Sequence, residues 1–145
     1  MPIKSFRGLI IDGAIDTVML HTNDGSTGYK ITKLELYPAK FGNFDQKSTV
    51  TIFKTPQTTA TNVVDFSDNE LLAASCLSTD NSEANPLNLT TVFDNEIFNQ
   101  DIFICHKDAH ADNNPVNYYI ELEQIKLSLD ENTVATLKNI RNITG

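Results

Sequence analysis

The sequence contains no tryptophan and only two cysteines, six glycines and five prolines in 145 residues. Cys76 and Cys105 lie among apolar neighbours, in LLAASCL and IFIC, and neither belongs to a C-x-x-C pair. We therefore interpret both as small buried hydrophobic residues and not as a disulfide or a metal-binding pair. This use of cysteine argues against a small secreted domain that depends on disulfide bridges for its stability.

Basic residues are also scarce, with 11 Lys and Arg against 19 Asp and Glu, which gives a formal net charge of -8. A chain with this balance repels the phosphate backbone, so nucleic acid is not an expected partner. Such acidity is more typical of a feature that keeps a protein soluble.

Long apolar runs are missing as well. The N-terminal segment MPIKSFRGLIIDG has an apolar run of only three residues, far short of the core of a signal peptide. The chain also lacks the roughly 18 to 20 consecutive apolar residues that a membrane-spanning helix needs. We expect a soluble protein made in a cytoplasm, with no membrane partner, whose residues 1–145 form a single domain.

The sequence contains none of the common catalytic motifs. There is no G-x-S-x-G nucleophile elbow, no motif around a cysteine, and no glycine-rich phosphate loop. Paired carboxylates such as Asp12 and Asp16 fall in polar turns, where acidic residues are ordinarily solvated. The sequence therefore predicts no enzyme, no catalytic residue and no cofactor.

One segment does concentrate metal-ligand residue types. HKDAHAD, residues 106–112, offers His106, Asp108, His110 and Asp112. Two histidines at i and i+4 meet on a helix, but this piece leads into the loop signal NNP, so we predict a solvated loop and no metal site. A metal enzyme on a cupin-like barrel would need His21 to converge with His106 and His110.

What the sequence does contain is a series of short strand patterns separated by turn residues. The predicted strands cover residues 5–13, 16–22, 29–38, 48–56, 87–93, 100–107 and the segment from 117 onward. NDGSTG, residues 23–28, is expected to be a hairpin tip. LLAASCL, residues 71–77, fits either a helical turn or a buried strand. The fold class is all-β, a single β-sandwich or jelly roll of about seven to eight antiparallel strands.

Two of these strands change phase along their length. In YKITKLELY the apolar residues switch parity between Ile31 and Leu34, and in NYYIELEQIKL they switch around Gln124. An inserted residue, a β-bulge, restores the buried face after such a switch, so we predict two bulges that shape the sheet. Alternatively, the charges beside them form an exposed patch that a partner protein contacts; its residues are Lys33, Glu35, Glu121 and Glu123.

The C-terminal stretch SLDENTVATLKNIRNITG has the pattern of a short helix, about residues 130–141. Ser128 and Glu131 match a capping box, while Val134, Leu137 and Ile140 fall on one face. We expect this helix to cover an open end of the strand structure or to dock on a neighbouring subunit.

Three segments resemble small virion structural proteins of marine and cyanobacterial tailed bacteriophages: FRG at residues 6–8, GYKI at 28–31 and PVNYYIELEQIKLS at 115–128. The resemblance implies a capsid decoration or cement protein, or another component of the head or tail surface, located in the virion. Its implied partners are other virion proteins, such as the major capsid or tail protein, and further copies of itself, with a trimer favoured by analogy. Loops 55–62 and 80–88 are expected to touch a neighbour or face solvent.

The main alternative is a tail-associated module that binds a receptor or carbohydrate, in which exposed aromatic rings stack on sugars. Its candidates are Tyr37, Phe41, Phe44, Tyr118 and Tyr119. The absence of tryptophan, a strong stacking residue, makes this hypothesis the weaker one. The residues predicted to contact a partner are therefore Tyr37, Phe41, Phe44, Glu121 and Glu123.

Overall fold

The computed structural model describes residues 2–22, 25–40, 45–80, 83–110 and 113–128. Eight strands form within them: β1 (Ile3–Ile10), β2 (Ile15–Val18), β3 (Thr27–Pro38), β4 (Gln46–Phe53), β5 (Leu71–Asp80), β6 (Glu83–Phe93), β7 (Ile102–Asp108) and β8 (Val116–Lys126). The prediction of an all-β chain with about seven to eight antiparallel strands is thus confirmed.

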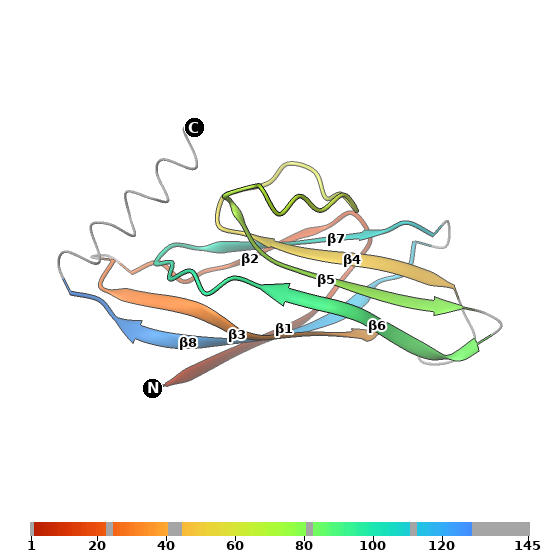
Figure 1. Cartoon of the computed structure of the whole chain (residues 1–145), viewed down its shortest axis with the longest axis horizontal. Helices are drawn as coiled ribbons and strands as arrows, with labels where there is room; N and C mark the ends of the chain where they lie inside the picture. The colour runs from red at the N-terminus through yellow and green to blue at the C-terminus, as the bar shows by residue number, and fades with distance from the viewer. Residues whose placement is uncertain (1, 23–24, 41–44, 81–82, 111–112, 129–145) are drawn as a thin grey trace.

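The strands form two antiparallel sheets, shown in Figure 1. One has the order β1-β8-β3 and the other the order β2-β7-β4-β5-β6. The first four strands alternate between the sheets along the chain. Because β2 and β3 belong to different sheets, the connection between them is a crossover, and the expected hairpin tip at residues 23–28 was wrong. A dense run of turn residues indicates a change of direction but does not specify which strands pair.

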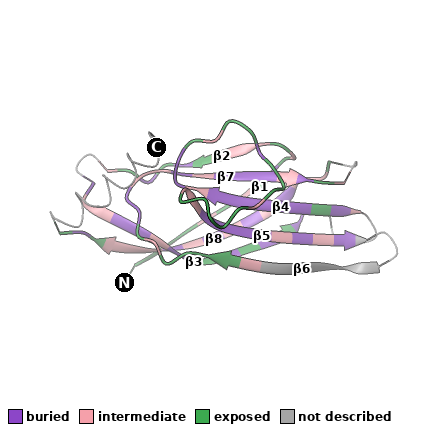
Figure 2. Ribbon diagram, turned by 45° about the horizontal axis from the view of Figure 1, so that its top comes forward, coloured by how far each residue is buried: buried purple, intermediate pink, exposed green. Residues whose placement is uncertain are grey.

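A single hydrophobic core joins the two sheets. The three-stranded sheet contributes Ile31 and Ile120, and the five-stranded sheet contributes Val50 and Ile104, each 2% exposed or less. Burying one such side chain stabilises the fold by about 1.5–3 kcal/mol. Figure 2 shows the buried residues concentrated on β7, β4 and β5, the inner strands of the larger sheet.

Strands β4 and β7 are buried on both faces, and the continuous apolar run IFIC in β7 is typical of a strand buried in this way. Thr51 and Cys105 have the opposite parity to the core residues beside them, yet each is only 1% exposed. The loop between β4 and β5 lies above this side of the sheet in Figure 1. The threonines of β4 therefore lie in the interior and do not face solvent.

The predicted phase change in β3 is a β-bulge at Thr32. Ile31 pairs with Leu122 and Lys33 pairs with Glu121, so Thr32 is the extra residue. Its hydroxyl donates to the carbonyl of Glu121 at 3.1 Å. The bulge keeps Ile31 and Leu34 both in the core in spite of their opposite parities.

The second expected bulge, around Gln124, was wrong. β8 pairs with β3 without a shift from Leu122 to Lys126, and the amide of Gln124 also donates to the carbonyl of Pro2. Ile125 is only half-buried, while Leu127 is buried just after the strand ends. The switch in apolar pattern therefore marks the end of the strand.

LLAASCL is a strand, the first part of β5, which settles the open alternative. The expected loop at residues 80–88 was wrong, because most of it belongs to β6, which pairs antiparallel with β5. Pro86 is compatible with this because β6 lies at the edge of its sheet, where a missing amide donor costs no ladder bond. Residues 56–62 form a loop with mostly exposed residues, as expected, although Thr55 is buried.

The expected helix at residues 130–141 lies outside the described residues. In the described part of the chain, no helix is long and apolar enough to cross a membrane.

Candidate interaction surface

The predicted contact residues that the structure describes lie together on the outer face of the three-stranded sheet. Tyr37 is on β3, and Glu121 and Glu123 are on β8, its neighbour. Phe41 and Phe44 lie outside the described residues. Side chains alternate between the two faces of a strand, so these odd-numbered positions point away from the core residues Leu36, Ile120 and Leu122.

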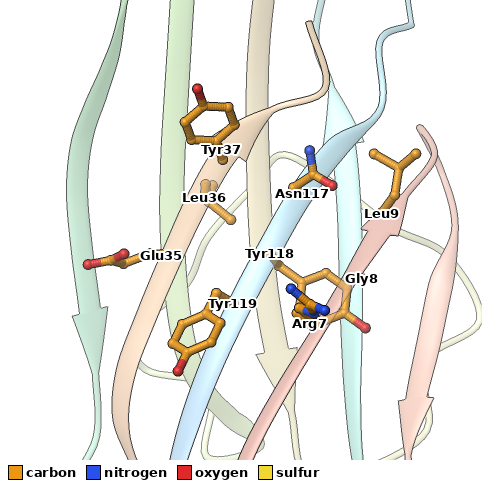
Figure 3. Close-up of a pocket in the computed structure, with 9 residues that line it drawn as sticks. All are labelled: Arg7, Gly8, Leu9, Glu35, Leu36, Tyr37, Asn117, Tyr118 and Tyr119. Atoms are coloured by element: carbon orange, nitrogen blue, oxygen red, sulfur yellow. The ribbon is translucent and has the colours of Figure 1, made fainter. Parts of the chain in front are cut away.

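Two rows of side chains cross this face, each with one residue from β1, one from β8 and one from β3. In the first row Tyr119 pairs with Arg7 on one side and Glu35 on the other. In the second row Asn117 lies between Leu9 and Tyr37. Together the two rows line a shallow hollow of about 550 Å³, which we call the Tyr119 groove (Figure 3); its side chains are Arg7, Leu9, Glu35, Tyr37, Asn117 and Tyr119.

The floor of the groove is fixed from below by Tyr118. Its ring lies across Gly8, where an added Cβ would be 2.9 Å from the tyrosine hydroxyl oxygen. The hydroxyl donates to Asp16 Oδ2 at 3.2 Å, and burial together with the nearby Asp16 carboxylate raises the pKa of Tyr118 to about 12. Tyr118 is therefore a core residue and not a sugar-stacking candidate, because its even-numbered position faces inward.

Charges on this face are mostly paired with one another. Lys30 Nζ lies 3.6 Å from Glu123 Oε2, and Lys33 Nζ lies 3.6 Å from Glu35 Oε1. The hydroxyl of Tyr119 donates to Glu121 at 3.1 Å, and Lys33 also lies 5.8 Å from the Tyr119 ring centroid. The predicted charged patch thus exists on one face, although Glu121 and Glu123 are half-buried.

Arg7 lines the Tyr119 groove, and it is absent from the candidates that the sequence suggested. It is exposed, and among the described residues its guanidinium has no ion pair or hydrogen-bond partner. Leu9, on the same face, is 55% exposed. Both have the parity opposite to the buried Ile10 on β1, and that signal could have identified them.

A second exposed apolar surface lies on the other sheet. Phe66 is 70% exposed, and it lines a hollow of about 280 Å³ with Val92 and Phe93 at the end of β6; we call this the Phe66 hollow. The loop that carries Phe66 is anchored at its start, because the buried Lys54 places its Nζ 2.6 Å from Glu96 Oε1.

The three histidines do not form a common site. His21 Nδ1 lies 2.7 Å from Asp101 Oδ1, and His110 Nε2 lies 3.6 Å from Asp45 Oδ2. His106 is fully buried and contacts neither of these carboxylates through any described bond. Within the described ranges there is no group of three or more His, Cys, Asp or Glu residues placed to hold a metal ion. Asp112 lies outside those ranges.

The expected solvated loop at HKDAHAD was wrong for its first half. His106 and Asp108 still belong to β7 and are 0% and 2% exposed. One oxygen of Asp108 accepts the amides of Lys47 and His110, and the other accepts the amide of Asn114. The Asp108 carboxylate therefore accepts backbone amides around the turn between β7 and β8, whereas the sequence predicted that it would be solvated.

His106 is held by hydrogen bonds on both ring nitrogens. Nδ1 lies 3.1 Å from the carbonyl of Ile10 and 3.2 Å from that of Ile11, so Nδ1–H donates and Nε2 accepts the Ser48 hydroxyl at 2.8 Å. Gln46 Nε2 donates to the same Ser48 oxygen at 2.7 Å. Burial lowers the pKa of His106, although the carbonyl contacts and the carboxylates of Asp12 and Asp108 oppose this effect. The pair resembles a Ser–His dyad, but both residues are closed to substrate.

Both cysteines are free thiols, as predicted. Cys105 is buried, and this burial raises the pKa of its thiol to about 11, so the thiolate that a nucleophile requires is scarce at neutral pH. Cys76 is only half-buried, so the interpretation of this residue as buried was wrong.

Comparison with protein-family models and with curated proteins gives no match to this chain.

Proposed function

We propose that the protein is a non-enzymatic structural component of a bacteriophage particle, most simply a decoration or cement protein on the capsid. The observation that carries this proposal is the presence of two separate exposed surfaces with apolar residues, the Tyr119 groove and the Phe66 hollow, on different sheets. A chain that presents two such surfaces can contact two different neighbours, as a subunit in a symmetric shell must.

We further infer that the two sheets form a jelly-roll sandwich. The first strand pairs with the eighth, the second with the seventh and the fourth with the fifth, which is the winding of a jelly roll. β6 departs from this winding because it pairs with β5 and not with β3, whose edge is instead bridged at Tyr29 by Phe98. Jelly rolls occur in viral capsid proteins and in lectins, which supports the proposal by analogy alone.

The test is binding to capsid shells. The purified protein is mixed with shells that lack it, and the bound fraction is measured by sedimentation, with isolated tails as the comparison. Saturable binding to shells at a fixed number of copies supports the decoration role. Binding to tails alone would indicate a tail component in place of a capsid component. No binding to either particle contradicts the proposal.

A second candidate function is carbohydrate or receptor binding through the Tyr119 groove. It is favoured by the two tyrosines in that groove, of which Tyr37 is 61% exposed, next to the amide of Asn117. Tyrosine rings that flank polar groups in an open groove suit stacking on sugar rings. This candidate predicts that Tyr37→Ala weakens binding on a glycan array without lowering the melting temperature, whereas an unchanged glycan profile would exclude it.

A further inference from the structure

The outer face of the three-stranded sheet is almost neutral on a strongly acidic chain. Its outward positions carry three basic and three acidic side chains, Arg7, Lys30, Lys33, Glu35, Glu121 and Glu123. The whole chain carries a net charge of -8. Two copies repel each other over most of their surface, and this face is one where they can approach without that cost.

In the Tyr119 groove, the side chains on the two sides of β8 are at matching levels but differ in character. At one level Arg7 lies on the β1 side of Tyr119 and Glu35 on the β3 side. At the next level Leu9 and Tyr37 flank Asn117 in the same way. The central strand thus separates a basic group from an acidic one, and an aliphatic group from an aromatic one.

We propose that this face joins two copies of the chain in a face-to-face dimer whose two-fold axis runs along β8. Such an axis lays β1 of one copy over β3 of the other. Arg7 then meets Glu35 of the second copy, Leu9 meets Tyr37, and each of these contacts occurs twice. The two Tyr119 rings and the two Asn117 amides meet at the axis.

The groups that this dimer brings together are available for it. Among the described residues Arg7 has no ion-pair partner, and the one ion pair of Glu35, whose side chain is 61% exposed, is with Lys33 at 3.6 Å. Arginine and tyrosine are also among the side chains enriched at the centres of protein interfaces. Glu121 lies on β8, near the proposed axis, where two copies of its carboxylate could repel each other. The Tyr119 hydroxyl donates to this carboxylate, and the twist of the sheets moves the two faces apart away from the groove.

The dimer is expected to be weak. Two rows on three strands cover a small patch, because strands lie about 4.8 Å apart and residues on one face about 6.8 Å apart. The contact therefore falls at the low end of specific interfaces, below about 1,200 Å² in total. The inference rests on the proposed assembly role, in which copies are concentrated on a particle.

A charge swap tests the dimer in solution. The mass of the full chain is measured by sedimentation equilibrium from about 10 μM to about 1 mM, a range chosen for weak interfaces. Arg7→Glu alone places two carboxylates opposite each other, and Glu35→Arg alone places two guanidinium groups opposite each other. Each single variant is expected to weaken dimerisation by about tenfold or more.

Mixing the two single variants is the decisive arm, because a heterodimer of R7E with E35R recovers both opposite-charge contacts. The doubly substituted chain, R7E with E35R, recovers them in a homodimer. Lys47→Glu, an exposed charge reversal on β4, is the matched control and is expected to leave the mass unchanged. Circular dichroism establishes that each variant is folded.

Three results would overturn the dimer: a monomer at all concentrations, an oligomer that ignores both single variants, or mixtures that fail to recover association. Shell binding is assayed separately with the wild-type chain and with the R7E variant. A wild-type chain that stays monomeric and still binds shells defeats the dimer but preserves the proposed function, whereas a dimer that ignores shells does the reverse.

Discussion

At the scale of single residues, several polar side chains of the types used in catalysis and metal binding lie in the interior of the fold. The side chains that resemble catalytic or metal-binding groups, such as His106, Asp108 and Ser48, are buried and hydrogen-bonded within the fold. A buried polar group without a partner would cost about 1–3 kcal/mol, so the hydrogen bonds that these three side chains make stabilise the fold.

The buried His106 makes stability depend on pH. Its pKa is lowered in the folded state from its ordinary value of 6.5, so the unfolded chain binds a proton at a pH where the folded chain does not. The free energy of unfolding is therefore expected to fall as the pH drops below 6.5, and to level off below the folded pKa. Urea denaturation at a series of pH values measures this.

The substitution His106→Asn removes the titrating group and is expected to flatten the dependence below pH 6.5, at a cost in stability. His110→Gln is the matched control, because His110 is only half-buried and lies close by in the sequence. Equal slopes for wild type and His106→Asn would contradict the assignment.

Gly8 gives a second prediction at this scale. An alanine here would place its Cβ 2.9 Å from the hydroxyl oxygen of Tyr118, whose ring is buried and bonded to Asp16. Gly8→Ala is expected to lower the free energy of unfolding by about 1–3 kcal/mol. The loss should be smaller in a Tyr118→Phe background, which lacks that oxygen. A double-mutant cycle by chemical denaturation measures the difference, and strict additivity would refute the contact.

At the scale of elements, β3 shows how one residue determines a register. Ile31 and Leu34 are both in the core only because Thr32 is bulged out of the ladder. Deleting Thr32 would turn the side chains on one side of it outward, including either Ile31 or Leu34. Each exposed core residue costs about 1.5–3 kcal/mol, so we expect the deletion to cost more than about 3 kcal/mol or to prevent folding.

The matched change is Thr32→Ala, which keeps the residue count and removes only the hydroxyl bond to Glu121 at an exposed site. It is expected to cost about 1 kcal/mol or less. Thermal denaturation of both variants is the measurement. A deletion variant as stable as Thr32→Ala would show that the bulge has no role in the register.

At the scale of the whole molecule, the two exposed surfaces are expected to serve different contacts. Phe66 is 70% exposed, so Phe66→Ser should leave the melting temperature unchanged while it weakens binding to shells by about tenfold or more. Met19→Ser is the control, because Met19 is 67% exposed in the connection that follows β2. Sedimentation with shells measures both variants, and equal binding by the two would remove the Phe66 hollow from the proposed interface.

The sequence by itself determined most of the elements. Period-two alternation and the positions of Gly and Pro predicted most of the strands, and consecutive polar residues predicted the bulge at Thr32, because these signals arise from neighbours along the chain. It also predicted that Tyr37, Glu121 and Glu123 lie on an exposed surface. The polar hairpin of β5 and β6 was missed, because an edge strand can be polar and still pair.

Only the tertiary structure decided which strands are neighbours, and with them the character of each face. Pairing β8 with both β1 and β3 places Arg7 level with Glu35 although they lie far apart in the sequence. The same packing encloses His106 and Asp108, which a local pattern of polar residues assigned to solvent. Burial and cross-strand proximity depend on contacts between distant segments, and a local pattern carries no information about them.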